Sequence, residues 1–186
     1  MKFSRIFLCL ATLTLCFSQL SAFDDASTYA KAAMGRPDGW LSFYNTHTGE
    51  SLRVQYVSEA GQWVPAALER LNYFFRCHTD GKFVAMNPRL FVVIDTIQDH
   101  FGADKTIQII SGYRSPELNA VLHARSSGVA KHSRHMCGEA IDIRIPGVPA
   151  REVYKYAWNL QQGGVGCYTG SNFVHVDVGP VRTWGI

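Results

Sequence analysis

Two short segments of this sequence alternate apolar and polar residues, and both have metal-binding residue types at polar positions. The segments are Glu139-Ala-Ile-Asp-Ile-Arg-Ile and Phe173-Val-His-Val-Asp-Val. Such alternation predicts β-strands, in which successive side chains point to opposite faces. If the two strands pair, Asp142 and His175 converge on one side of a sheet, above a layer of isoleucine and valine side chains.

A third candidate ligand lies just before the first of these strands. His135 is too far from Asp142 for the two to occupy adjacent turns of one helix, so we expect a loop to deliver it. Zinc accepts histidine and aspartate, and three protein ligands plus a water form a catalytic zinc site. The sequence therefore predicts one zinc ion bound by His135, Asp142 and His175. The alternative is that each is an ordinary structural residue, which requires that both strands present ligand types on their polar faces by coincidence.

The same residues resemble a known zinc motif. The run from Ser133 to Asp142, SRHMCGEAID, followed by a histidine on a strand, is similar to the motif of the D-alanyl-D-alanine metallopeptidases, the LAS group. The runs SGYRSP from Ser111 and FVHVD from Phe173 resemble the MepK-type murein endopeptidases more closely, and the likeness extends over residues 42–184. This resemblance implies a zinc-dependent hydrolase that cuts peptide cross-links between the stem peptides of peptidoglycan.

Three residues near the motif are expected to contact substrate. Arg114 lies between a predicted strand and a predicted helix that Ser115 caps, where a guanidinium can project into a cleft. In related metallopeptidases the arginine of this motif approaches the substrate, and its planar fork suits a carboxylate or a developing oxyanion. We expect Asn119 and Ser133 to form part of the same wall. The alternative for Arg114 is a surface ion pair with a carboxylate.

The general base does not follow the wider group. Many LAS enzymes have Glu three residues before the last histidine or His two residues before it, whereas this chain has Asn172 and Phe173 there. Asp177 is the nearest carboxylate on the face of His175, so we predict it as the base, with orientation of a ligand histidine as the competing role. Because the usual base is missing, a non-catalytic, zinc-stabilised module that binds peptidoglycan is an alternative function.

The N-terminal residues predict export. Residues 1–22 combine Lys2 and Arg5 with a short apolar run and a small-residue end, which is typical of a secretory signal peptide. We expect a periplasmic protein with a flexible segment at residues 23–39. No later stretch is apolar over a length that could span a membrane.

Charge and cysteine content restrict the remaining possibilities. Loss of Lys2 and Arg5 with the signal lowers the formal net charge from +3 to about +1, two positive charges fewer. No cluster of Lys and Arg with interleaved aromatics occurs, which argues against nucleic-acid binding. Cys77, Cys137 and Cys167 remain, and one disulfide among them is possible without its partners being deducible. We expect a monomer.

The periodicity of the rest predicts a single metallopeptidase domain at residues 40–186 with an α+β fold. The expected strands are 40–45, 51–57, 106–110, 139–145, 164–168 and 173–178, and the expected helices are 64–78, 88–102, 116–128 and 149–162. We expect a small antiparallel sheet with the zinc site on it and helices packed on one side.

Overall fold

The computed structural model describes residues 37–126 and 128–185. The predicted signal peptide, residues 1–22, and most of the predicted flexible segment lie outside the described residues. In the part that is described, no helix combines the length and the apolar character needed to cross a membrane.

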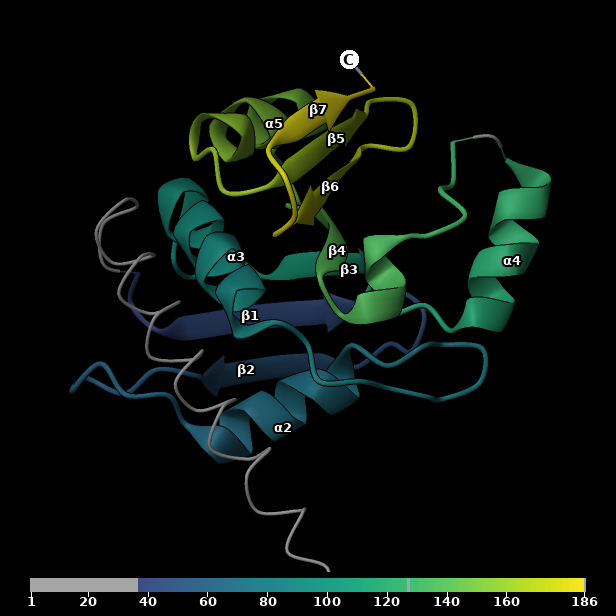
Figure 1. The fold of residues 1–186 in the computed structure, drawn as a ribbon. Coiled ribbons are helices and arrows are strands. Elements are labelled where there is room, and N and C mark those ends of the chain that lie inside the picture. Colours follow the sequence, from purple (N-terminus) through teal and green to yellow (C-terminus); the bar gives the residue numbers. More distant parts are fainter. Residues whose placement is uncertain (1–36, 127, 186) are drawn as a thin grey trace, which may run out of the picture.

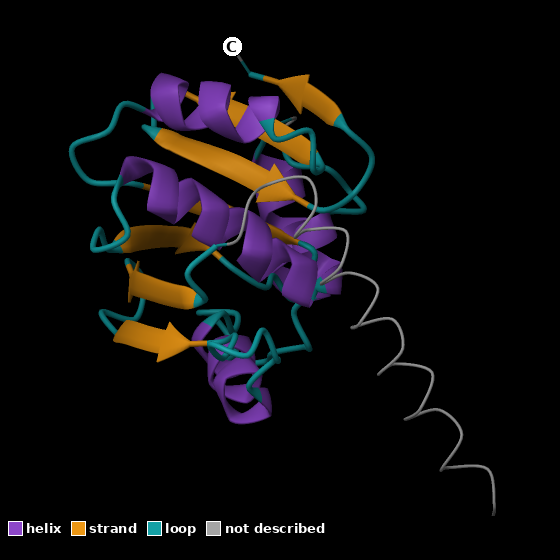
Figure 2. Cartoon of the chain, turned by 90° about the vertical axis from the view of Figure 1, so that its left-hand side faces the viewer, coloured by secondary structure: helices purple, strands orange, loops and turns teal. Residues whose placement is uncertain are grey.

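A mixed sheet of seven strands runs through the described residues, with the strands side by side in the order β2-β1-β3-β4-β6-β5-β7 (Figures 1 and 2). The strands are β1 (Trp40–Asn45), β2 (Ser51–Gln55), β3 (Ile107–Ser111), β4 (Ala140–Arg144), β5 (Gly164–Tyr168), β6 (Phe173–Asp177) and β7 (Arg182–Trp184). The predicted α+β class and the six predicted strands are confirmed.

The sheet was expected to be antiparallel, but two pairs of adjacent strands are parallel. β1 lies parallel to β3, and β5 lies parallel to β7. A parallel neighbour requires a long crossover connection, and the helices between β2 and β3 provide one. β7 has three residues, which is too short for an alternating pattern to reveal it.

The four described helices are α2 (Pro65–Phe74), α3 (Pro88–Phe101), α4 (Pro116–Arg125) and α5 (Ala150–Asn159). Each lies within a predicted helical range and ends before the predicted limit. The first three have proline in the first turn, where the missing N–H costs no hydrogen bond. The side chain of Asn87 caps α3 and that of Ser115 caps α4, each by accepting a backbone N–H.

Three of these helices pack on one face of the sheet. Phe43 of β1 contacts Phe74 of α2 and the adjacent Phe75, and Phe75 stacks on Phe91 of α3 with ring centroids 5.9 Å apart. The apolar side chains of β4 and β6 belong to the same buried core, which α5 also covers. α4 lies apart from the other helices (Figure 1). The opposite, polar face of β4 and β6 is therefore left for a site.

Strand register aligns the candidate residues. Asp142 of β4 is paired with His175 of β6, so the predicted convergence of these two side chains is confirmed. On the other side of β6, Gly166 of β5 is paired with the same histidine.

Candidate metal centre

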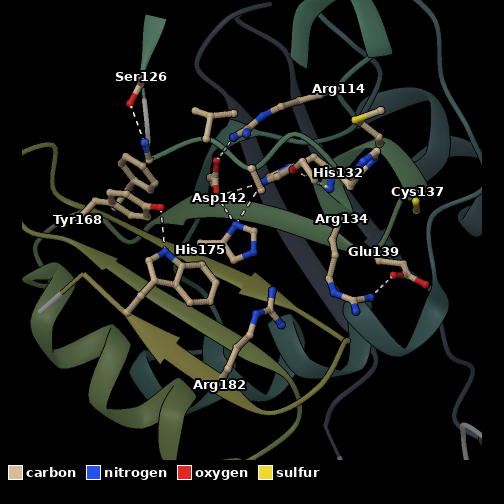
Figure 3. Close-up of a pocket in the computed structure, with 18 of the residues that line it drawn as sticks. Arg114, Ser126, His132, Arg134, Cys137, Glu139, Asp142, Tyr168, His175 and Arg182 are labelled. Carbon is tan, nitrogen blue, oxygen red and sulfur yellow. Dashed lines mark hydrogen bonds and ion pairs between the residues drawn. The ribbon is translucent and has the colours of Figure 1, made fainter. Parts of the chain in front are cut away.

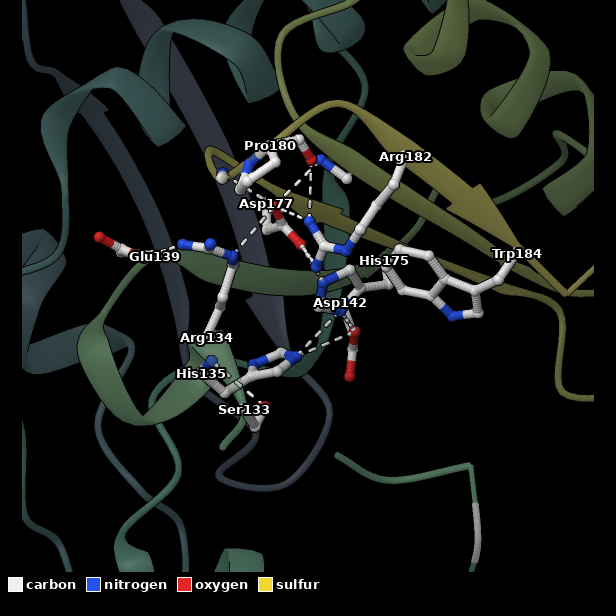
Figure 4. A network of polar contacts seen from close by, with 12 residues as sticks. Ser133, Arg134, His135, Glu139, Asp142, His175, Asp177, Pro180, Arg182 and Trp184 are labelled. Atoms are coloured by element: carbon white, nitrogen blue, oxygen red, sulfur yellow. Dashed lines mark hydrogen bonds and ion pairs between the residues drawn. The ribbon is translucent and has the colours of Figure 1, made fainter. Parts of the chain in front are cut away.

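Three donor atoms from separate parts of the chain meet on this polar face (Figure 4). His135 comes from η1 (Arg134–Cys137), a short 3-10 helix before β4, and the other two come from β4 and β6. His135 Nε2 lies 3.2 Å from both Asp142 Oδ1 and His175 Nδ1, and these two atoms are 2.9 Å apart. The structure thus brings together the three residues that the sequence singled out.

The spacing of the three atoms suits a tetrahedral metal ion. In a tetrahedral site with metal–ligand bonds near 2.0–2.2 Å, neighbouring ligand atoms lie about 3.3–3.6 Å apart. The observed separations of 2.9–3.2 Å are slightly shorter, so a small outward shift of the side chains would fit the ion. Two imidazole nitrogens and a carboxylate oxygen are also the donor types of catalytic metal sites with an open fourth position.

Hydrogen bonds on the far side of each imidazole aim its free nitrogen at this cluster. His135 Nδ1 lies 2.7 Å from the carbonyl oxygen of Gly112. A carbonyl only accepts, so Nδ1 holds the proton and Nε2 offers its lone pair. His175 Nε2 lies 3.0 Å from Asp177 Oδ2, which leaves the lone pair of Nδ1 for the cluster.

Local sequence explains how η1 presents His135. The Ser133 hydroxyl caps η1 by accepting the backbone N–H of His135. Gly138 ends the turn with φ of +69°, and a Cβ at that position would lie 2.7 Å from the carbonyl oxygen of Ala85. The serine and glycine of the motif therefore have structural reasons for their spacing around the histidine.

Burial and contacts within the cluster shift the pKa values of His135, Asp142 and His175. Burial lowers the pKa of His135, which favours the neutral ring that a metal requires. Burial alone would raise the pKa of Asp142, but contacts with His135 and His175 hold it well below the usual value. For His175, hydrogen bonds to Asp142 and Asp177 outweigh the effect of burial and raise its pKa.

Asp177 is buried behind the His175 ring, on the side away from the three donor atoms (Figure 4). Its carboxylate accepts the backbone N–H groups of Gly164 at 3.0 Å and Gly179 at 2.8 Å, and it pairs with Arg182 at 2.6 Å. Burial would raise the pKa of Asp177, but these hydrogen bonds and the one from His175 lower it. This geometry favours the competing role from the sequence, orientation of a histidine, over proton abstraction.

Arg114 connects the end of β3 to the cluster. Its Nε donates to Ser111 Oγ at 2.8 Å, and its Nη2 pairs with Asp142 Oδ2, the oxygen that faces away from the two histidines. The predicted position between a strand and a capped helix is confirmed. Figure 3 shows the guanidinium at the edge of the cavity in front of Asp142.

A cleft of about 910 Å³ opens in front of the cluster and includes Arg114 and Ser133 in its lining. Sequence reasoning did not single out several other residues of its wall, which are Arg134, Glu139, Tyr168, Arg182 and Trp184 (Figure 3). Trp184 Nε1 donates to Tyr168 Oη at 2.9 Å, and the indole lies against the His175 ring with centroids 5.1 Å apart. Tyr168 lies on β5, and Arg182 and Trp184 lie on β7. No sequence motif indicates the pairing of these two strands.

Asn119 has a different position from the one expected. It is buried, and its Nδ2 donates to the carbonyl oxygens of Ala130 and Lys131, both at 3.1 Å. It holds the loop that leads to η1 and does not line the cleft. The three cysteines of the described residues are free thiols in this structure.

The fold and the site together define a class. An α+β chain with a buried His/Asp/His cluster at the floor of a polar cleft is built as a metal-dependent hydrolase. Comparison with known proteins gives the family: residues 33–184 match the family described as Peptidoglycan L,D-endopeptidase MepK. This chain belongs to that family, a group of metallopeptidases, as its motifs suggested.

Two relatives show the extent of the likeness. The Peptidoglycan L,D-endopeptidase MepK of Escherichia coli (strain K12) is 42% identical over 144 residues, which cover 77% of this chain and 79% of the relative. A Probable peptidoglycan L,D-endopeptidase MepK of Haemophilus influenzae is 46% identical over 145 residues, 77% of each chain. The family match over residues 33–184 includes the three donor residues and all the residues that line the cleft.

Proposed function

We propose that this chain is a zinc-dependent L,D-endopeptidase that hydrolyses peptide cross-links between the stem peptides of peptidoglycan. The observation that supports it most directly is the convergence of His135 Nε2, Asp142 Oδ1 and His175 Nδ1 at the floor of the cleft. When bound there, one zinc ion supplies Lewis acidity that activates water near neutral pH and polarises the scissile carbonyl.

The surrounding residues keep the donors in place and bind the substrate. The Gly112 carbonyl and Asp177 hold the two imidazoles in the tautomer and orientation that a metal needs. Arg114 is held at two of its nitrogens, and among the described residues its Nη1 has no hydrogen-bond partner. We assign this free end of the guanidinium to a substrate carboxylate or to the oxyanion that develops at the scissile carbonyl.

The proton of the attacking water needs an acceptor other than Asp177, whose carboxylate is fully engaged behind His175. Two other residues in the cleft wall, His132 and Glu139, have side chains of the types that act as general bases. Glu139 Oε2 lies 2.5 Å from Arg134 Nη1, so this carboxylate is held at the cleft wall by an ion pair. Glutamine at each position in turn identifies which residue the reaction uses.

The substrate places this activity outside the cytoplasm, in the periplasm, which agrees with the signal peptide predicted at residues 1–22. Peptidoglycan is then the partner, and we propose that the enzyme acts as a monomer because all three metal ligands come from one chain.

Incubation with purified sacculi tests the proposal. The wild-type protein should release muropeptides whose L,D-cross-links have been cut, and a chelator should stop the release until zinc is added back. His135→Ala is the inactive control. Binding to sacculi without release of fragments by the zinc-loaded protein would refute the hydrolase and leave a binding module.

A further inference from the structure

A second cavity, of about 610 Å³, adjoins the cleft. Arg114, Asp142 and Phe173 line both cavities. Asp142 of the donor cluster therefore lies where the two cavities meet, whereas His135 and His175 line the cleft alone. A molecule bound at Asp142 can extend in two directions. Apart from the three shared residues and Ser111, the residues that line the second cavity were not part of the motifs found in the sequence.

One wall of the second cavity is an apolar side of α4. Leu118, Val121 and Leu122 lie along it, and Arg125 lies at its end. Val121 is 46% exposed, so its side chain is available to a ligand in the cavity. This surface offers an aliphatic contact with a positive charge beside it.

Another part of the lining is formed by two histidines from separate turns. His47, in the turn between β1 and β2, and His78, after α2, stack with ring centroids 3.9 Å apart and planes 4° from parallel. The Ile110 carbonyl, at the end of β3, accepts the Nε2–H of His47 at 3.0 Å. Burial lowers the pKa of His78, and the nearby His47 and Arg114 lower it further.

The charges of this cavity favour an anionic ligand. Arg114 already pairs with Asp142, whereas Arg125 has no ion pair with any of the described residues, so it is the unpaired cation of the lining. The one carboxylate in the lining besides Asp142 is Glu117, which pairs with Lys82 at 3.3 Å. A carboxylate with an aliphatic stem matches this side of α4, because it meets Arg125 and Val121 together.

We propose that the second cavity binds one arm of the cross-linked substrate while the cleft binds the other. This inference rests on the proposed function. A cross-link joins two stem peptides, so an endopeptidase must hold chain on both sides of the bond that it cuts. Stem peptides have free carboxylates and short aliphatic side chains, which suit Arg125 and Val121. The His47–His78 pair forms another part of the wall of this subsite.

Steady-state kinetics on matched substrates tests the subsite. The substrates are an intact L,D-cross-linked dimer and two analogues, each with one arm shortened to the residue at the scissile bond. The variants are Arg125→Glu and Val121→Ser, and the control is Arg151→Glu, an exposed arginine of α5 outside both cavities. For the dimer, Arg125→Glu should raise KM about tenfold with little change in kcat, the effect of one lost charge-assisted contact.

The shortened substrates decide between a subsite and a general defect. Wild-type enzyme should have a raised KM for one analogue, the one that lacks the arm held in the second cavity, and Arg125→Glu should raise it no further. An unchanged KM for the dimer, or an equal increase for both analogues, would overturn the inference.

A binding measurement separates this inference from the proposed function. If wild-type protein cuts none of the substrates, the endopeptidase proposal fails. Calorimetric titration of the zinc-loaded protein with the free stem tetrapeptide then tests the subsite alone. Weaker binding by Arg125→Glu but not by Arg151→Glu would still support an acidic-peptide subsite, whereas equal binding by all three proteins would refute it.

Discussion

Asp177 Oδ2 lies 3.0 Å from His175 Nε2, and the two residues are two positions apart on β6. Side chains at that spacing share a face of the strand, so the geometry of β6 itself makes the carboxylate and the imidazole neighbours. The other ring nitrogen, Nδ1, faces His135 and Asp142. Asp177 can therefore influence a metal ion only through the ring of His175.

Asp177→Asn should weaken zinc binding by about tenfold to a hundredfold, because the amide no longer stabilises the ring with a full charge. Excess zinc should restore the rate of muropeptide release. The measurement is that rate across a zinc titration, with Asp104→Asn, an exposed aspartate, as the control. A rate that stays about a hundredfold low at saturating zinc would instead identify Asp177 as the general base.

His135→Ala and Asp142→Ala should each lose both zinc and activity, because an incomplete set of ligands binds the ion poorly. Metal analysis of the purified wild-type protein should give one zinc per chain. His100→Ala replaces an exposed histidine outside the cleft and should keep full zinc content. Wild-type protein that is free of zinc and equally active after chelation would contradict the metal centre.

Most of the candidate site could be predicted because its information is local. β4 and β6 each alternate with a period of two residues, so the faces of Asp142 and His175 followed from the sequence of each strand alone. The prolines and caps that begin α3 and α4 likewise mark the helix starts without reference to the rest of the fold.

The parts that could not be predicted depend on contacts between distant segments. The pairing of β7 with β5 places Trp184 over Gly166, and neither segment shows this in its own sequence. Asn119 was expected in the same wall as Arg114. In the structure, the loop at Ala130 and Lys131 folds back onto it and accepts its hydrogen bonds. Both arrangements depend on how distant segments pair or pack, and the periodicity of a single segment contains no information about that.

Arg114→Lys should reduce turnover more than stability. Lysine keeps the positive charge, but its donors are all on one nitrogen, so it cannot reach Ser111, Asp142 and the substrate at three separate positions as the guanidinium does. The comparison is kcat for the cross-linked dimer against the midpoint of a thermal melt. A melting temperature that collapses while the folded fraction cuts at the normal rate would show that Arg114 has only a structural role.

Asp95 of α3 should make stability depend on pH. It is fully buried, its Oδ2 accepts from Tyr56 Oη at 2.8 Å, and its Oδ1 has no partner among the described residues. Burial, together with the charges of Asp99 and Asp38, raises the pKa of Asp95 to about 8. Between the unfolded pKa near 3.9 and this value, the folded state binds the extra proton, so stability falls as pH rises.

The expected loss is at most about 1.4 kcal/mol per pH unit, and it should level off above about pH 8. Asp95→Asn has no carboxyl to ionise and should lack this component. Urea midpoints from pH 5 to pH 9, measured in parallel for the two proteins, give the difference, and contributions from the metal centre cancel. Identical slopes for both proteins would show that Asp95 is ionised throughout the range.

Gly166→Ala should disturb the cleft from behind. Gly166 is paired with both His175 and Trp184 across the sheet, and an added Cβ would lie 2.5 Å from Trp184 Cε2. The indole must then move, which breaks its hydrogen bond to Tyr168 and its contact with the His175 ring. Overpacking of this kind costs about 1–3 kcal/mol, less where a side chain can shift.

We therefore expect a modest loss of stability with a larger loss of activity on the cross-linked dimer. Gly170→Ala in the same β5–β6 hairpin is the matched control, because a Cβ there meets nothing within 4 Å. The readouts are kcat/KM for the dimer, the thermal midpoint and zinc content. If Gly166→Ala matches Gly170→Ala in kcat/KM, the position of Trp184 against His175 does not matter for catalysis. If zinc content falls together with activity, the indole supports the metal ligand rather than the substrate.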